Sequence, residues 1–392
     1  MSLGIFMLVL AYVLSQFYRA FLAVLSPVLE AELGAGPEDL SFASGLWFLT
    51  FAIMQLPVGW ALDTIGPRKT AATLFVFGGA GGALVFAVAT TPMHINIAMV
   101  LIGIGCSPVL MASYFIFART YPAAVFATMA AFVIGVGSLG NIAGSAPMAW
   151  AVEAFGWRET MFGLALVSAA IAVAVWFSVN DPERVETDAK GSVFDLLKIP
   201  ALWFIFPMMF VNYAPAAGLR GLWIGPYMSD IFGADAARIG TATLVMALAM
   251  VVGNFVYGPL DRIFGTRKWV IFVGNAIGVT ACFALWSFDN SSIWTATFWF
   301  AAVGFCGGSF PVMIAHSKTF FPAHLTGRGV TLLNLFGIGG AGLMQVITGR
   351  IYAAKLSESG SPAVAYDTLF LFFGLLVCAG LAIYAFSQDR MD

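Results

Sequence analysis

The chain alternates long apolar stretches with short polar ones along its whole length. Uncharged runs such as 1–18, 71–91 and 269–288 are each 18 residues or longer. A helix of that length crosses the ~30 Å hydrocarbon core of a bilayer, because each residue adds ~1.5 Å. The pattern predicts an all-α polytopic membrane protein with 12 transmembrane helices, at 4–29, 41–62, 71–90, 95–118, 125–152, 160–180, 201–228, 239–259, 269–288, 293–317, 329–352 and 365–386.

One polar stretch divides this series of spans in the middle. Residues 181–200 contain eight charged side chains, include Pro182 and end at Pro200. Such a composition is typical of a solvated linker. We therefore predict an N-terminal six-helix bundle at 1–180, a cytoplasmic linker at 181–200 and a C-terminal six-helix bundle at 201–392.

Basic residues predict how the chain is oriented. With the N-terminus inside, twelve Lys and Arg residues of the loops lie on the cytoplasmic side and four on the other side. The positive-inside rule then places both termini in the cytoplasm. The first span has no basic stretch before it and no cleavage site, so we interpret it as a helix and not as a signal peptide. The prediction is a protein integral to the cytoplasmic (inner) membrane.

Composition removes several classes of function. The chain is 60% hydrophobic and 10% charged, whereas soluble domains carry ~25% charged residues. The net charge of −2, without basic clusters, indicates no nucleic-acid partner. The four cysteines lie in apolar runs without metal-ligand spacing, so no metal or cofactor is predicted. The sequence contains no nucleophile with an adjacent base and no Gly-x-x-x-x-Gly-Lys-Ser/Thr loop, so neither an enzyme nor an ATP-driven pump is predicted.

The two halves of the chain repeat one another. Gly59-Trp-Ala-Leu-Asp63-Thr-Ile-Gly66-Pro-Arg68-Lys69 follows the second span, and Gly258-Pro-Leu-Asp261-Arg262-Ile-Phe-Gly265-Thr-Arg267-Lys268 follows the eighth, at an offset of 199. Glycines of the fifth and eleventh spans recur at an offset of 202, and Arg19 and Arg220 are 201 residues apart. Three features at nearly one offset indicate an internal duplication.

The loop after the second span resembles the signature of the major facilitator superfamily of secondary transporters, Gly-x-x-x-Asp-x-x-Gly-x-Arg-Lys/Arg. The second copy departs from it, because Asp261 follows Gly258 by three residues instead of four. The resemblance implies two pseudo-symmetric six-helix bundles around a central cavity. It also implies a conformational latch formed by Gly59, Asp63, Gly66, Arg68, Lys69, Asp261 and Arg267. From its position, we expect Asp63 to pair with Arg68 and Lys69 or to cap a neighbouring helix.

Two arginines lie inside predicted spans, where a charge costs at least ~2.5–3.5 kcal/mol unless it finds a partner. Arg19 belongs to the first span and Arg220 to the seventh, and every acidic residue falls in a loop or at a span end. Either arginine alone could bond to carbonyl or hydroxyl groups and brace the bundle. For the pair, the missing counter-charge is most simply a substrate with carboxylate, phosphate or sulfonate oxygens, which guanidinium binds bidentately. The pair resembles the organophosphate and organic-anion branches of the superfamily, where arginines of the first and seventh helices clamp the anion.

Other polar and aromatic residues of the spans are candidates for lining this site, and each could equally make a packing hydrogen bond. His316 could also carry a proton, although a neutral histidine bonded to a carbonyl is the competing interpretation. The candidates are Tyr12, Gln16, Tyr114, Asn141, Asn212, Tyr213, Trp223, His316, Asn334 and Gln345.

The sequence thus predicts a secondary transporter of a small anion, working by alternating access, as a monomer in the lipid bilayer. Without a membrane carboxylate, an empty site with two positive charges disfavours unloaded return, which favours exchange or uniport. Proton symport through His316 is the alternative, with a proton or a counter-anion as the coupling ion. Efflux of drug-like compounds is another. Copper transport through Met246 and Met250 is a weaker alternative, since no His or Cys is spaced to support it.

Overall fold

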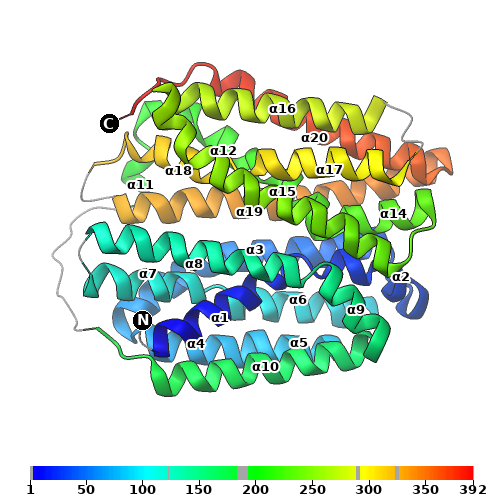
Figure 1. Cartoon of the computed structure of the whole chain (residues 1–392), viewed down its shortest axis with the longest axis horizontal. Helices are drawn as coiled ribbons and strands as arrows, with labels where there is room; N and C mark the ends of the chain where they lie inside the picture. The colour runs from blue at the N-terminus through cyan, green and yellow to red at the C-terminus, as the bar shows by residue number, and fades with distance from the viewer. Residues whose placement is uncertain (1–2, 122, 183–192, 288–291, 323–325, 392) are drawn as a thin grey trace. The chain divides into compact units, whose positions relative to one another are not determined.

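The computed structural model describes residues 3–121, 123–182, 193–287, 292–322 and 326–391. Within these ranges the secondary structure is helical and contains no strand (Figure 1). The predicted all-α fold class is confirmed. The chain divides into two compact units, Met1–Glu186 with Asp235–Thr241, and Thr187–Ala234 with Ala242–Asp392. The predicted domain boundaries stay predictions, because residues 183–192 of the linker lie outside the described part of the chain.

Unit 1 is built from helices of the first half of the chain. They are α1 (Leu3–Phe17), α2 (Leu22–Leu33), α3 (Pro37–Thr64), α4 (Pro67–Leu74), the π-helical η1 (Phe75–Ala80), α5 (Gly81–Ala87), α6 (Pro92–Cys106), α7 (Val109–Thr120), α8 (Ala123–Ala143), α9 (Ala146–Phe155) and α10 (Trp157–Ser178). Proline stands in the first turn of α3, α4 and α6, where its fixed φ favours a helix start and its missing N–H costs no bond.

Unit 2 contains the remaining helices, with the first residues of α15 assigned to unit 1. They are α11 (Val193–Leu196), the 3-10 helix η2 (Pro200–Phe204), α12 (Phe206–Asn212), α13 (Ala214–Gly218), the π-helical η3 (Leu219–Trp223), α14 (Ile224–Phe232), α15 (Ala236–Phe264), α16 (Lys268–Ser287), α17 (Ile293–Gly307), α18 (Phe310–Lys318), α19 (Thr326–Ser359) and α20 (Pro362–Tyr384).

The helices are long and apolar enough to cross a membrane. The described residues contain 10 such helical stretches, or up to 12 if two bent helix pairs each count as one span. The bent pairs are Leu3–Phe17 with Leu22–Leu33, at 51°, and Phe132–Ala143 with Ala146–Phe155, at 43°. Each of the twelve predicted spans overlaps one of these stretches. Large apolar side chains such as Phe77 and Phe177 are exposed, as expected for surfaces that face lipid.

Glycines let paired helices of each unit approach closely. A side chain at Gly140 of α8 would lie 1.9 Å from the backbone oxygen of Val13 in α1, and one at Gly340 of α19 would lie 1.9 Å from that of Phe210 in α12. Small residues permit such backbone contact in membrane helices. Since Gly140 and Gly340 belong to the repeated glycine segments, the internal duplication is visible in the packing of each unit.

Candidate functional site

Both membrane arginines lie where the helix is irregular. Arg19 falls between α1 and α2, in a turn where its N–H donates to the Gln16 carbonyl at 3.2 Å. Arg220 falls in the π-helical segment η3. Breaks and π-segments free backbone groups from the regular ladder and recur at functional sites. The sequence did not predict the break at Arg19, whereas Pro215, Gly218 and Gly221 had indicated that the helix of Arg220 can bend.

The guanidinium of Arg19 rests on aromatic rings of α3. Its Cζ lies 5.0 Å from the centroid of the Trp47 ring and 4.9 Å from that of Phe51. The residue is 9% exposed, and its buried Nε has no hydrogen-bond partner. Within the described residues, no carboxylate forms an ion pair with Arg19. Ring faces attract a cation without neutralising it, so the positive charge stays available to a ligand.

Three predicted lining residues of unit 1 belong to the packing of α1 against α8. Gln16 precedes Arg19 by one turn and donates from Nε2 to the Tyr12 hydroxyl at 2.8 Å. A Cβ at Gly140 of α8 would lie 2.9 Å from the Cβ of Gln16 in α1. Asn141, the next residue of α8, therefore lies beside the same turn of α1 as Gln16. All three side chains are buried. The structure therefore places Tyr12, Gln16 and Asn141 where α1 packs against α8, in the turns before Arg19.

Arg220 is more deeply buried than Arg19 and has polar contacts. It is 0% exposed. Its Nη2 lies 3.3 Å from the Tyr213 hydroxyl and its Nη1 lies 3.5 Å from the Met250 sulfur. Nε is buried without a partner, and no ion pair to Arg220 occurs in the described part of unit 2. Since oxygen and sulfur here accept without carrying charge, the guanidinium charge is again uncompensated.

Other predicted residues of unit 2 have separate contacts. Trp223 donates from Nε1 to Thr348 Oγ1 at 3.0 Å. A side chain at Gly218 would lie 2.7 Å from Gln345 Oε1, so Gln345 of α19 reaches the turn before Arg220. Asn334 is half-buried on α19, and its role stays a prediction.

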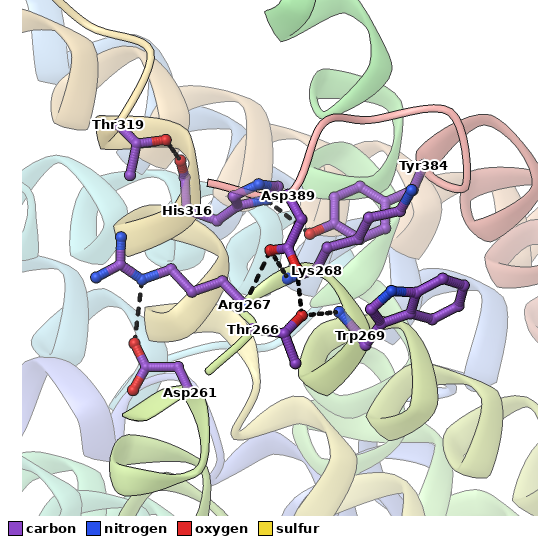
Figure 2. Close-up of polar contacts among 9 residues, drawn as sticks. All are labelled: Asp261, Thr266, Arg267, Lys268, Trp269, His316, Thr319, Tyr384 and Asp389. Atoms are coloured by element: carbon purple, nitrogen blue, oxygen red, sulfur yellow. Dashed lines mark hydrogen bonds and ion pairs between the residues drawn. The ribbon is translucent and has the colours of Figure 1, made fainter. Parts of the chain in front are cut away.

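His316 belongs to a different cluster, at the end of α20 (Figure 2). Its Nε2 lies 2.8 Å from the Gln388 carbonyl and its Nδ1 lies 2.7 Å from the Tyr384 hydroxyl. Because a carbonyl only accepts, Nε2 carries the hydrogen, and Nδ1 can accept from Tyr384 in a neutral ring. These contacts match the competing interpretation of a neutral histidine bonded to a carbonyl. They connect His316 to the residues after α20 and not to Arg220.

The latch residues of unit 1 pair differently from our expectation. Asp63 forms an ion pair with Arg119 of α7 at 3.5 Å, and not with Arg68 or Lys69. Arg68 instead contacts Asp181, which accepts from its backbone N–H at 2.8 Å and lies 3.7 Å from its Nε. The chain bends sharply at Gly66, with φ +105°, and this turns the start of α4 toward Asp181.

A Cβ at Gly66 would lie 2.9 Å from the Asp181 carboxylate, so this turn of the chain is in direct contact with Asp181. Gly59 and Lys69 are exposed. The expected local pairing of Asp63 fails because Asp63 and Arg68 lie on opposite sides of this turn, at the end of α3 and the start of α4. The carboxylate that meets Arg68 comes from the residues after α10.

The equivalent cluster of unit 2 is held by residues after α20 (Figure 2). Arg267 Nε donates to Asp261 at 3.0 Å, and both residues belong to the latch that the resemblance implies. Asp389 accepts from the backbone N–H of Arg267 at 3.2 Å and of Lys268 at 3.0 Å, and also from the Thr266 hydroxyl. Partial burial tends to raise the pKa of Asp389, but these hydrogen bonds and the nearby His316 outweigh it and hold that pKa below its usual value.

Asp181 and Asp389 are functional candidates that the sequence reasoning missed. Each follows the last helix of its unit and accepts from the backbone at the start of the helix after the signature loop. Carboxylates stabilise helix N-termini, whose N–H groups lack partners. The sequence signal that could have identified them is an acidic residue that follows the sixth span and another that follows the twelfth.

Comparisons with known proteins agree with this architecture. The model of the Major Facilitator Superfamily matches residues 8–221 and again 205–391. NicT of Pseudomonas putida is 22% identical over 79% of this chain and 80% of its own length. SauU of Cupriavidus necator is 24% identical over 70% of each chain. Their names provisionally assign metabolite transport to NicT and sulfoacetate transport to SauU.

A solved structure shows the same fold. The D-xylose-proton symporter superposes with a TM-score of 0.78, covering 98% of this chain and 97% of the symporter at 15% identity.

Proposed function

The chain belongs to the Major Facilitator Superfamily, and we propose that it is a secondary transporter in which Arg19 and Arg220 bind a small organic anion. The relatives are named as transporters, and one of those names specifies a sulfonate that also carries a carboxylate. Bidentate binding by guanidinium suits either group.

One observation carries the proposal. Two guanidinium groups are at least nine-tenths buried, each in an irregular helical segment, and within the described residues neither forms an ion pair. An unpaired buried charge is costly. Its retention in both units is accounted for if an anionic ligand supplies the counter-charge.

Alternating access between the two units is the proposed mechanism, with exchange or uniport as its mode. Without an anion, two positive charges would have to reorient in a medium of low dielectric constant. Proton symport through His316 is less favoured, because both of its ring nitrogens bond near the end of α20. Copper transport is also less favoured, because the Met250 sulfur contacts the Arg220 guanidinium, and a neighbouring positive charge repels a metal cation.

The test is uptake of labelled anions into proteoliposomes by Arg19→Lys and Arg220→Lys. Lysine keeps the charge and loses the bidentate fork, so we expect uptake to fall at least tenfold while yield and thermal stability persist. Arg262→Lys, at an exposed position of α15, is the matched control. Normal uptake by both test variants would refute the anion-binding role.

The same vesicles test the transport mode. Anion preloaded inside should stimulate uptake strongly at fixed pH, and an imposed pH gradient should have little effect. Accumulation driven by the gradient and lost in His316→Gln would instead establish proton symport.

Orientation is tested by labelling introduced cysteines in intact cells with an impermeant reagent. We propose that both termini and the linker are cytoplasmic. Ser359→Cys, at an exposed site after the eleventh span, should react from outside, and Ser192→Cys in the linker should not. The reverse pattern would invert the proposed orientation.

A further inference from the structure

We propose that the Arg19 site selects hydroxylated organic anions. Arg19 binds the charged group, and the side-chain oxygens of Gln16 and Asn141 accept hydrogen bonds from hydroxyl groups of the same cargo. This inference rests on the proposed function, because it names the class of anion for that site.

Gln16 presents a buried acceptor one turn before Arg19. Its amide nitrogen donates to the Tyr12 hydroxyl at 2.8 Å. Its Oε1 is buried and has no hydrogen-bond partner, and the residue is 9% exposed. This leaves one carbonyl-type acceptor with nothing to accept from.

The turn between α1 and α2 puts Gln16 and Arg19 on one side of the chain. The Arg19 N–H donates to the carbonyl of Gln16, three residues earlier. In a turn of this 3-10 type, side chains three residues apart eclipse one another. The two side chains therefore leave this turn on the same side of the chain.

Asn141 supplies a second unpaired acceptor at the same level. A side chain at Gly140 would touch Gln16, and one at Gly144 would lie 3.2 Å from the Ala20 Cβ. Asn141 lies between these contacts on α8, so it is level with the segment that carries Gln16 and Arg19. It is 7% exposed, and its Oδ1 is buried without a partner.

The chemistry of the missing partner follows from these atoms. Leaving a buried acceptor unpaired costs ~1–3 kcal/mol, and two such acceptors call for a donor. An ammonium donor is disfavoured because the Arg19 guanidinium would repel it. A neutral hydroxyl group can donate to one of these acceptors without being repelled by Arg19, and an anion without a hydroxyl group leaves both oxygens unpaired.

The test compares matched anions that differ by one hydroxyl group, lactate with propionate and 4-hydroxybenzoate with benzoate. Affinity is measured by thermal shift on the purified full chain and by competition in proteoliposomes. In at least one pair, we expect the hydroxylated member to bind about tenfold tighter or more. Gln16→Met, Asn141→Ala or both should abolish this preference, according to which oxygen accepts from the hydroxyl group.

Asn96→Ala is the matched control. The Oδ1 of Asn96 is also buried without a partner. Asn96, however, lies ten residues before Cys106, and Cys106 is the end of α6 that contacts Ser15 of α1. This variant should keep the hydroxyl preference. Gln16→Met preserves side-chain length and is the informative variant if Asn141→Ala folds poorly.

The two proposals fail in different ways. Equal binding of both members of every pair, lost in Arg19→Lys, would refute the hydroxyl inference and leave anion transport standing. A preference that survives in both Gln16→Met and Asn141→Ala would also refute it. Failure of all these anions to bind, or binding that does not depend on Arg19, would refute anion binding at this site and the inference with it.

Discussion

The two membrane arginines occupy equivalent places in the repeat but have different surroundings. Arg19 lies against the rings of Trp47 and Phe51, whereas Arg220 contacts a hydroxyl group and the Met250 sulfur. Phe51 and Met250 are themselves 199 residues apart, the offset of the signature loops. The duplication has thus kept the charge and its position, while the partner at the equivalent position has changed.

This difference suggests a division of labour between the units. Aromatic faces hold a guanidinium in place but leave its N–H groups unused. The Tyr213 hydroxyl, in contrast, uses one N–H of Arg220. We therefore expect Arg19 to be the more available anchor and Arg220 to exchange its present contacts for the anion.

The largest effect is expected from Arg220→Met. Removing a buried, unpaired charge removes its desolvation cost, so the thermal midpoint should rise while uptake falls by roughly a hundredfold. Paired melting and uptake measurements check this. A lower midpoint together with lost uptake would mean that Arg220 braces the fold.

A smaller effect is expected from the partners of the arginines. Trp47→Leu removes a ring contact worth ~0.5–2 kcal/mol, so anion affinity should weaken about threefold to thirtyfold. Met250→Leu should change affinity by less than about threefold, because a thioether is a weak acceptor. Titration of both variants by thermal shift decides the comparison, and equal losses would contradict the division of labour.

The latch clusters differ between the units in the same way. Asp63 is 65% exposed in its pair with Arg119, whereas Asp261 is 10% exposed in its pair with Arg267. Breaking an exposed pair costs little, whereas removing one partner of a buried pair leaves an unpaired buried charge and costs more. Asp261→Asn should therefore slow exchange more than Asp63→Asn, with anion affinity kept in both. Unchanged exchange rates in both variants would mean that these loops form no latch and that their charges serve only to orient the chain in the membrane.

The smallest effect concerns pH. The pKa of Asp389 in the folded protein is below its usual value. Ionised Asp389 therefore stabilises the folded state at any pH above its pKa in the unfolded chain, ~3.9, and this stabilisation is lost as pH falls through the lower pKa of the folded state. Hydrogen exchange at the Arg267 and Lys268 amides, corrected for intrinsic rates, should therefore speed up only in this acidic range. In Asp389→Asn the exchange should be fast and lack this step. An identical step in the variant would assign it to another group.

The sequence by itself determined the span pattern, the duplication and the two membrane arginines. These depend on local composition, because about twenty apolar residues define a span wherever it packs. The sequence also located the signature loops, and it placed Tyr12 and Gln16 in the same span as Arg19. Helix periodicity was sufficient there, since residues one turn apart share a face.

Only the tertiary structure decided which residues are partners. Asp63 forms an ion pair with Arg119 of another helix. Arg68 contacts Asp181, 113 residues later in the chain. His316 contacts Gln388, 72 residues later. The breaks at Arg19 and in η3 were likewise invisible in the apolar pattern. Hydropathy is the same for a straight and a bent span, and side-chain pairing depends on how helices distant in sequence pack together.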